Sequence, residues 1–168
     1  TYMGIEPHTF VTAWLALTPS NAELGCIKVI PGSHKHGILS HQDTFGEDNI
    51  LTRGQTIEDI DESSAVDLVL RPGQISLHHA RTVHGSMPNR GKQRRLGVAL
   101  QCYMQPDCRQ VIGENLAQVV RGCADLSGYT ILNRPVEDMD RAAVNERERA
   151  NKNWAEILYH GASQVRSY

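Results

Sequence analysis

Hydrophobic and polar residues alternate along several short segments in the first two thirds of the chain. In the segment 9–18 (TFVTAWLALT), Val11, Ala13 and Leu15 fall on one side and Trp14 falls on the other. A period of two residues is typical of β-strands, which β-branched and aromatic residues also favour. The same reasoning predicts strands in GCIKVIPGS and at 65–70, 74–80 and 95–104.

Helical periodicity is confined to the last third of the chain. The segment 113–122 is compatible with a short helix, and 141–162 is a stronger candidate that Gly161 would end. We expect its inward positions to be Val144, Trp154 and Leu158. Many short strands followed by helices indicate an all-β core, an antiparallel sandwich or jelly roll, with a C-terminal helical segment packed outside.

The chain length of 168 residues fits one domain, 1–168, with a partly helical C-terminal extension at 105–168. The segment 40–64 is polar and loop-like, and between positions 43 and 62 it holds seven acidic residues against one basic residue, Arg53. Long connections inside compact domains are commonly functional. We therefore predict a lid-like loop at 40–64.

The charge balance argues against nucleic acid and anionic lipid as binding partners. A net charge of −2 and a pI near 6.4 offer no basic surface for nucleic acid or anionic lipid. No apolar run has the roughly 18 residues of a membrane helix. The four cysteines lack a CxxC spacing and are interpreted as reduced, mostly buried thiols of a cytoplasmic protein.

The segment SLHHARTVHGSMPNRGKQRR (76–95) carries the candidate chemistry. Read as a hairpin, it brings His84 close to Arg95 across an antiparallel pair. A neutral imidazole suits a transition metal, and a guanidinium suits a carboxylate that Ser86 could share. The alternative is that His84 is a structural histidine and that the arginines are solvated turn charges.

The other histidines are weaker candidates. His78 and His79 are adjacent in a predicted strand, so at most one points inward, and both are interpreted as supporting residues. This alternation also argues against a zinc hydrolase built on the three histidines of 76–95. The remaining histidines lie in predicted loops or near the chain end and are expected to face solvent: His8, His34, His36, His41 and His160.

Two stretches together resemble the phytanoyl-CoA dioxygenase family of iron(II)- and 2-oxoglutarate-dependent oxygenases. They are VTAWLALTPSNAELGCIKVIPGSHKHG and GQISLHHARTVHGSMPNRGKQRRLGVALQCY, and the resemblance covers roughly residues 2–104. It implies a double-stranded β-helix (a cupin-like jelly roll) and the cofactors Fe(II) and 2-oxoglutarate. The implied reaction is hydroxylation of a small organic substrate by dioxygen, with 2-oxoglutarate decarboxylated to succinate.

The resemblance also assigns roles to residues. His84 would be the distal iron ligand, Arg95 would pair with the far carboxylate of 2-oxoglutarate, and Ser86 and Trp14 would assist. The family's His-x-Asp pair, which completes a facial triad, is expected just upstream of Thr1, so the domain is interpreted as truncated. His41 and Asp43 match the motif in letters only, because they follow the IPGSHKHG turn, and are not expected to be ligands.

Two other functions remain open from the sequence. Relatives that replace the motif carboxylate by Gly or Ala are halogenases, and the position that decides this precedes Thr1. A non-catalytic jelly-roll binding module is the other alternative, against which the presence of both His84 and Arg95 argues. Arg121 is a weak candidate contact for an anionic substrate group.

Overall fold

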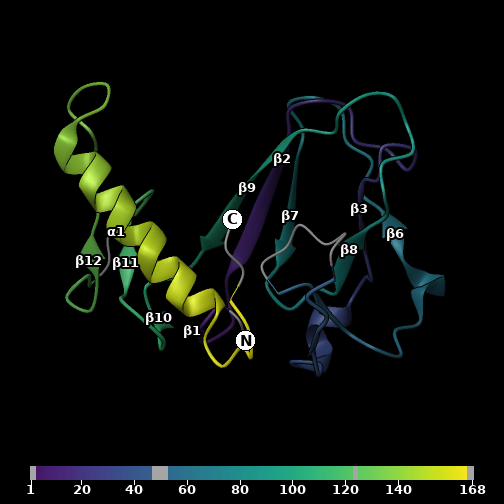
Figure 1. The fold of residues 1–168 in the computed structure, drawn as a ribbon, viewed down its shortest axis with the longest axis horizontal. Helices are drawn as coiled ribbons and strands as arrows, with labels where there is room; N and C mark the ends of the chain where they lie inside the picture. The colour runs from purple at the N-terminus through teal and green to yellow at the C-terminus, as the bar shows by residue number, and fades with distance from the viewer. Residues whose placement is uncertain (1–2, 47–52, 123–124, 166–168) are drawn as a thin grey trace. The chain divides into compact units, whose positions relative to one another are not determined.

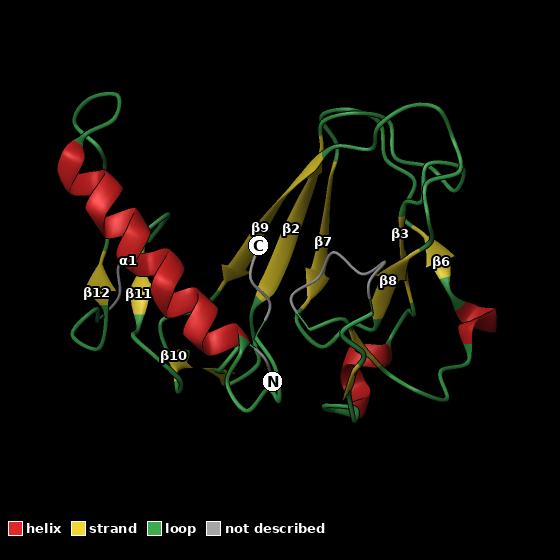
Figure 2. Ribbon diagram, in the orientation of Figure 1, coloured by secondary structure: helices red, strands yellow, loops and turns green. Residues whose placement is uncertain are grey.

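The computed structural model describes residues 3–46, 53–122 and 125–165 (Figure 1). The chain divides into two compact units that are interleaved in sequence. The first unit comprises Thr1–Pro7, His41–Thr56 and Pro106–Tyr168, and the second comprises His8–Ser40 and Ile57–Gln105. Short strands dominate both, and the described residues form a single α-helix (Figure 2). The prediction of a mainly β chain with a C-terminal helix is confirmed.

The second unit contains a three-stranded antiparallel sheet in the order β7–β2–β9. Its central strand β2 (Val11–Ala16) lies between β7 (Ile75–His79) and β9 (Gly97–Tyr103), as Figure 1 shows. In the register Trp14 is opposite both Ser76 and Ala99. Three predicted strands that are far apart in sequence are thus hydrogen-bonded side by side.

A second sheet of this unit has the order β6–β3–β8. It consists of β3 (Ile27–Val29), β6 (Val66–Asp67) and β8 (His84–Ser86), again antiparallel. Two short 3-10 helices, η1 (Ser33–His36) and η2 (Glu62–Ser64), accompany it. The predicted hairpin between His84 and Arg95 is wrong, because β8 and β9 belong to different sheets. The turn residues in MPNRGK redirect the chain from one sheet to the other instead of pairing the two strands.

Strand β9 contains an irregularity that changes the predicted alternation. Ala13 is opposite Leu100, whereas Val11 is opposite Tyr103, so β9 has one extra residue between these pairs. Cys102 in this bulge has a φ of 62°, a left-handed conformation that non-glycine residues rarely adopt. The bulge transfers Tyr103 to the face of Leu100, although simple alternation predicts it on the opposite face. Burial raises the pKa of the Cys102 thiol to about 11.

The two faces of the β7–β2–β9 sheet differ in the exposure of their larger side chains. On one face Trp14 and Ala16 are buried. The opposite face is apolar but largely exposed, and its side chains include Ile75, Leu77 (70% exposed), Val98 and Leu100. A contiguous apolar surface of this kind is typical of a face that packs against further polypeptide.

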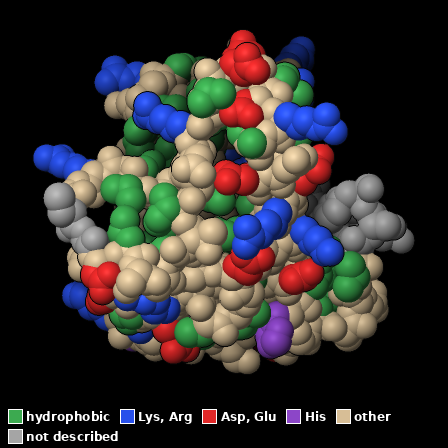
Figure 3. Space-filling model, turned by 90° about the vertical axis from the view of Figure 1, so that its left-hand side faces the viewer, with side chains coloured by type: hydrophobic (Ala, Val, Ile, Leu, Met, Phe, Trp, Pro, Cys, Tyr) green, Lys and Arg blue, Asp and Glu red, His purple; other side chains and the backbone are tan. Residues whose placement is uncertain are grey.

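The first unit is built from three two-stranded pairings and the helix. Antiparallel pairs join β1 (Ile5–Glu6) to β10 (Arg109–Gln110) and β4 (Gln42–Asp43) to β5 (Gln55–Thr56). A parallel pair joins β11 (Leu116–Ala117) to β12 (Thr130–Ile131). On the side shown in Figure 3, basic and acidic side chains lie interspersed among apolar ones.

Helix α1 (Arg141–Leu158) begins as predicted at residue 141 and ends before Gly161. The carboxylate of Asp140 caps it by accepting a hydrogen bond from the backbone N–H of Ala142, 2.9 Å away. The buried side chains are Asn153 and Ile157, one position before the predicted Trp154 and Leu158. No helix among the described residues has the length and apolar character needed to cross a membrane.

The helix predicted at 113–122 does not form. Gly113 has a φ of 76°, and a Cβ there would lie 2.5 Å from the Oδ1 of Asn153, so only glycine fits at this contact. Asn153 accepts a hydrogen bond from the N–H of Glu114 at 2.8 Å. Docking on α1 therefore holds this segment in an extended conformation, from which β11 follows.

The predicted lid-like loop 40–64 contains the pair β4–β5 and η2, and residues 47–52 lie outside the described residues. Asp43 forms an ion pair with Arg53 (2.6 Å) and accepts a hydrogen bond from Gln55. The hydrogen bond from Arg53 is the main cause that lowers the pKa of Asp43. The ion pair thus joins β4 to the residues that lead into β5, and the role of the segment as a lid stays a prediction.

Cys26 and Cys108 are buried and Cys102 is half-buried, and Cys26 and Cys102 are free thiols. These positions agree with the prediction of reduced, mostly buried cysteines. Cys123 lies outside the described residues.

Candidate functional site

Arg95 and Trp14 meet at the start of β9. The guanidinium carbon of Arg95 lies 5.5 Å from the centroid of the Trp14 ring, a cation–π geometry. Thr18 holds the backbone on both sides of Arg95: its hydroxyl donates to the carbonyl of Arg94 (3.0 Å) and accepts from the N–H of Leu96 (2.8 Å). The side chain of Arg95 is thus presented from a backbone segment that is fixed at two points.

Trp14 is 8% exposed and rests on the backbone of Gly97. A Cβ at position 97 would lie 2.1 Å from Cζ2 of the Trp14 ring, far inside van der Waals contact. The absence of a side chain at Gly97 therefore creates the space that the indole fills. This explains why a glycine stands in the first position of a strand.

We expect Gly97→Ala to destabilise the protein by about 2–3 kcal/mol, because the indole must move or the strand must shift. Urea unfolding would measure the loss. Gly85→Ala is the matched control, since a Cβ there meets nothing within 4 Å. Equal stability of the two variants would show that Trp14 does not rest on Gly97 as described.

His84 occupies the first position of β8. Its Nδ1 lies 2.7 Å from the backbone carbonyl of Thr82. A carbonyl only accepts hydrogen bonds, so Nδ1 carries the proton and Nε2 keeps a free lone pair. The imidazole is exposed, and its tautomer is the one that can ligate a metal through Nε2.

The turn before His84 is tied to the PGSH segment by Ser33. The buried Ser33 hydroxyl donates to the carbonyl of Ile30 (2.7 Å) and accepts from the N–H of Val83 (2.8 Å). The neighbouring His34 is not solvent-facing as predicted, because its ring contacts that of His79 with centroids 5.3 Å apart. One serine thus fixes the backbone next to the candidate ligand.

His78 connects the two sheets of the unit. It is opposite Thr12 in the register and shares the inner face with Trp14, and its ring centroid lies 5.2 Å from that of His84. Its Nδ1 is buried without a hydrogen-bond partner among the described residues, as is the hydroxyl of Ser76 on the same face. Burial, and to a smaller extent His84, lower the pKa of His78.

The sequence-predicted residues fall into two groups. His84 and Ser86 form the first group and, being two positions apart, share one face of β8. Arg95 and Trp14 form the second group. His78 lies between the two sheets, with its ring next to that of His84. Sequence reasoning did not select Ser76, and it interpreted His78 and His79 alike as supporting residues. The adjacent histidines were the available signal, but only strand pairing decides which one points inward.

Two other predicted positions lie in the first unit. Arg121 is exposed in a bend, and His41 is exposed beside β4. Within 3–46, 53–122 and 125–165, no group of three or more metal-ligating side chains is close enough to hold a metal ion. The described residues therefore supply one candidate ligand, His84, and not a complete metal centre.

Comparison with known proteins defines the class. The family model for phytanoyl-CoA dioxygenase (PhyH) matches residues 1–97, more than half of the chain. A probable phytanoyl-CoA dioxygenase of Caenorhabditis elegans is 31% identical over 121 residues, which cover 70% of this chain and 38% of that protein. The chain belongs to the phytanoyl-CoA dioxygenase family, whose cofactors are Fe(II) and 2-oxoglutarate.

Other relatives indicate the chemical range of the family. A probable α-ketoglutarate-dependent hypophosphite dioxygenase of Stutzerimonas stutzeri is 34% identical over 94 residues, covering 53% of this chain and 33% of that protein. Among solved structures, the non-heme monooxygenase ThoJ in its apo form superposes with a TM-score of 0.79 at 33% identity, covering 94% of this chain and 56% of ThoJ. The chain thus spans about a third to a little over half of the lengths of these relatives.

Proposed function

We propose that this chain supplies the distal metal ligand and the 2-oxoglutarate-binding residues of an iron(II)- and 2-oxoglutarate-dependent oxygenase with a jelly-roll core. The observation that carries the proposal is the inner face of the second unit. There the imidazole of His84, which is in the tautomer that can bind a metal, lies next to the ring of His78. His78 belongs to the same sheet as Trp14, and the guanidinium of Arg95 lies over the Trp14 ring.

The proposed roles follow from the chemistry of each side chain. Arg95 pairs with the distal carboxylate of 2-oxoglutarate, and the Ser86 hydroxyl donates a hydrogen bond to the same group. Trp14 shields this ion pair from water on one side, which strengthens it. Nε2 of His84 binds the iron, while the carbonyl of Thr82 keeps the ring in the required orientation.

Two further metal ligands are needed for a facial triad of two histidines and one carboxylate. We propose that a His-x-Asp pair in a longer chain, preceding the segment described here, provides them. The greater length of the relatives supports this assignment, and so does the engagement of Asp43 by Arg53 and Gln55. When bound, the iron would supply the oxidation chemistry, with 2-oxoglutarate as the source of electrons.

The proposed reaction is hydroxylation of a small organic substrate. Dioxygen supplies one oxygen atom to the substrate and the other to succinate, and carbon dioxide leaves from 2-oxoglutarate. The chain's own residues would bind and orient the cosubstrate and limit the access of water. The relatives include a probable α-ketoglutarate-dependent hypophosphite dioxygenase and a non-heme monooxygenase, so oxygenases of this kind act on more than one class of substrate.

The test is 2-oxoglutarate turnover by the full gene product with Fe(II), dioxygen and ascorbate. We expect succinate to form slowly without a substrate and faster when a substrate is added. Omission of iron should abolish succinate formation. If the protein neither binds 2-oxoglutarate in calorimetry nor forms succinate, the oxygenase proposal fails and a non-catalytic binding role takes its place.

A further inference from the structure

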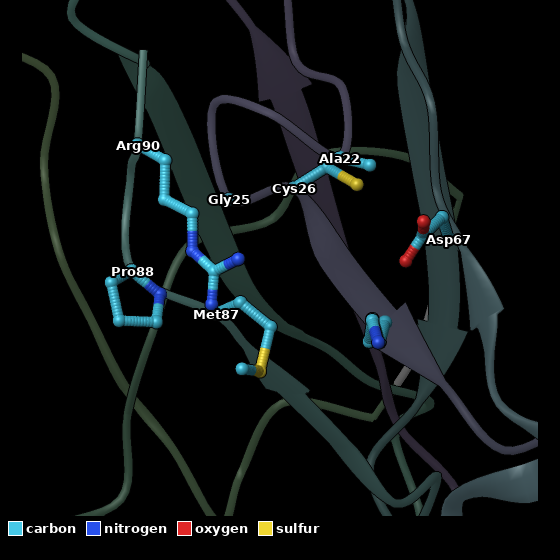
Figure 4. Close-up of a pocket in the computed structure, with 8 residues that line it drawn as sticks. Ala22, Gly25, Cys26, Asp67, Met87, Pro88 and Arg90 are labelled. Carbon is cyan, nitrogen blue, oxygen red and sulfur yellow. The ribbon is translucent and has the colours of Figure 1, made fainter.

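A cavity of about 250 Å³ lies beside the β6–β3–β8 sheet (Figure 4). Gly25 and Cys26 at its floor are buried, whereas Met87 and Arg90 at its rim are exposed. The cavity is therefore closed at one end and open to solvent at the other. Its lining combines apolar with charged side chains: Ala22, Gly25, Cys26, Lys28, Asp67, Met87, Pro88 and Arg90.

Two charged side chains of this cavity, Lys28 and Asp67, lie on a different face of the β6–β3–β8 sheet from His84. In the register, Val29 is opposite His84, whereas Lys28 is opposite both Asp67 and Gly85. Directly opposite residues share a face, and successive residues of a strand alternate. Lys28 and Asp67 consequently lie on the face opposite to that of His84.

Among the described residues, no ion pair joins the charged side chains of the cavity. Oδ1 of Asp67 is buried and has no hydrogen-bond partner among the described residues. Neither Lys28 nor Arg90 forms an ion pair with any residue in the described part of the chain. A buried carboxylate oxygen without a donor is costly, which makes Asp67 a strong acceptor for a ligand that brings one.

The Cys26 thiol gives the floor of the cavity an uncharged surface. The pKa of Cys26 is raised, mainly by its burial and next by the negative charge of Asp67. The thiol therefore stays protonated at neutral pH and acts as an apolar contact. Figure 4 shows the guanidinium of Arg90 extending from the rim near Met87 and Pro88, with the Asp67 carboxylate at the other side of the space.

We propose that this cavity binds a small carboxylate that also carries a hydroxyl or ammonium group. The ligand's carboxylate pairs with Arg90 and Lys28, and its hydroxyl or ammonium group donates to the carboxylate of Asp67. Two cations and one anion give the lining a net positive charge, which favours a ligand of net negative charge. Water occupies about 30 Å³ per molecule, so the volume suits about eight non-hydrogen atoms, the size of a hydroxy-dicarboxylate.

The test compares L-malate with succinate by calorimetry, because the two differ only by one hydroxyl group. We expect malate to bind at least tenfold more tightly than succinate to the unmodified protein. Asp67→Ala should remove this difference without lowering thermal stability, since the lost oxygen has no partner. Arg90→Gln should weaken both ligands, and Lys92→Gln, an exposed cation of the same turn, should weaken neither.

A second comparison separates this cavity from the oxygenase site. The titrations are repeated without added metal, with saturating 2-oxoglutarate, and on Arg95→Gln. Malate binding that persists in all three measurements supports the proposal and is independent of oxygenase activity. Malate binding that is lost in Arg95→Gln but retained in Arg90→Gln would place the ligand in the cosubstrate site and overturn it. Equal affinity for malate and succinate, or no binding of either, would overturn it as well.

Discussion

Substitution of Arg95 by glutamine is expected to weaken 2-oxoglutarate binding by about 30- to 1000-fold, which corresponds to roughly 2–4 kcal/mol. Glutamine keeps a hydrogen-bond donor but removes the charge and the bidentate geometry that match a carboxylate. The effect is large because the partner carboxylate would then be shielded from water without a cation. Calorimetry with 2-oxoglutarate gives the dissociation constant directly.

The matched control for this substitution is Arg94→Gln, in the adjacent position. Arg94 is exposed, whereas the guanidinium of Arg95 lies over the indole of Trp14. We expect Arg94→Gln to leave the affinity for 2-oxoglutarate unchanged within twofold. If both variants lost affinity for 2-oxoglutarate equally, the general positive charge of this segment, and not the position of Arg95 over Trp14, would attract the cosubstrate.

The second large effect is expected for His84→Ala, which should lower the affinity of the full gene product for Fe(II) by at least about 100-fold. Loss of a ligand costs more than loss of a residue that orients one, for which 10- to 100-fold is typical. Binding of Co(II), followed through its visible absorbance, provides a readout without turnover. The variant should also fail to form succinate.

Thermal stability distinguishes ligation by His84 from a structural role. The imidazole of His84 is exposed and hydrogen-bonds to the nearby carbonyl of Thr82. Removal of the imidazole should therefore hardly change the melting temperature of the metal-free protein. His36→Ala, an exposed histidine of η1, is the control and should retain metal binding. Retention of full metal affinity in His84→Ala would remove this residue from the proposed centre.

The candidate site residues could be selected from the sequence because their motifs are local. The HGS triplet and an arginine eleven residues later are read without knowledge of the fold, and so is the Trp in the TAW strand. The hairpin that was expected to join them was wrong, since β8 and β9 enter different sheets. Local turn chemistry specifies that the chain bends, but the partner of each strand is chosen by long-range packing.

The two predicted helical segments also differ in whether local sequence or tertiary contacts decide their structure. At 141–158, helical periodicity and the Asp140 cap act within one stretch of chain, and the helix forms where it is predicted. At 113–122 the helical pattern is weak, and contacts between Gly113 and Asn153 on α1 outweigh it. Helix propensity amounts to tenths of a kcal/mol per residue and is readily overridden by tertiary contacts.

The sequence by itself determined the strand-rich character of the chain, the start of its long helix, and the residue types that a metal and a carboxylate would need. Each of these is encoded by neighbours a few positions apart. Only the tertiary structure decided that His78 and not His79 lies near His84, that Gly97 makes room for Trp14, and that a bulge moves Tyr103 to the other face. These features depend on strand register and sheet partners, which are set by contacts between residues distant in sequence.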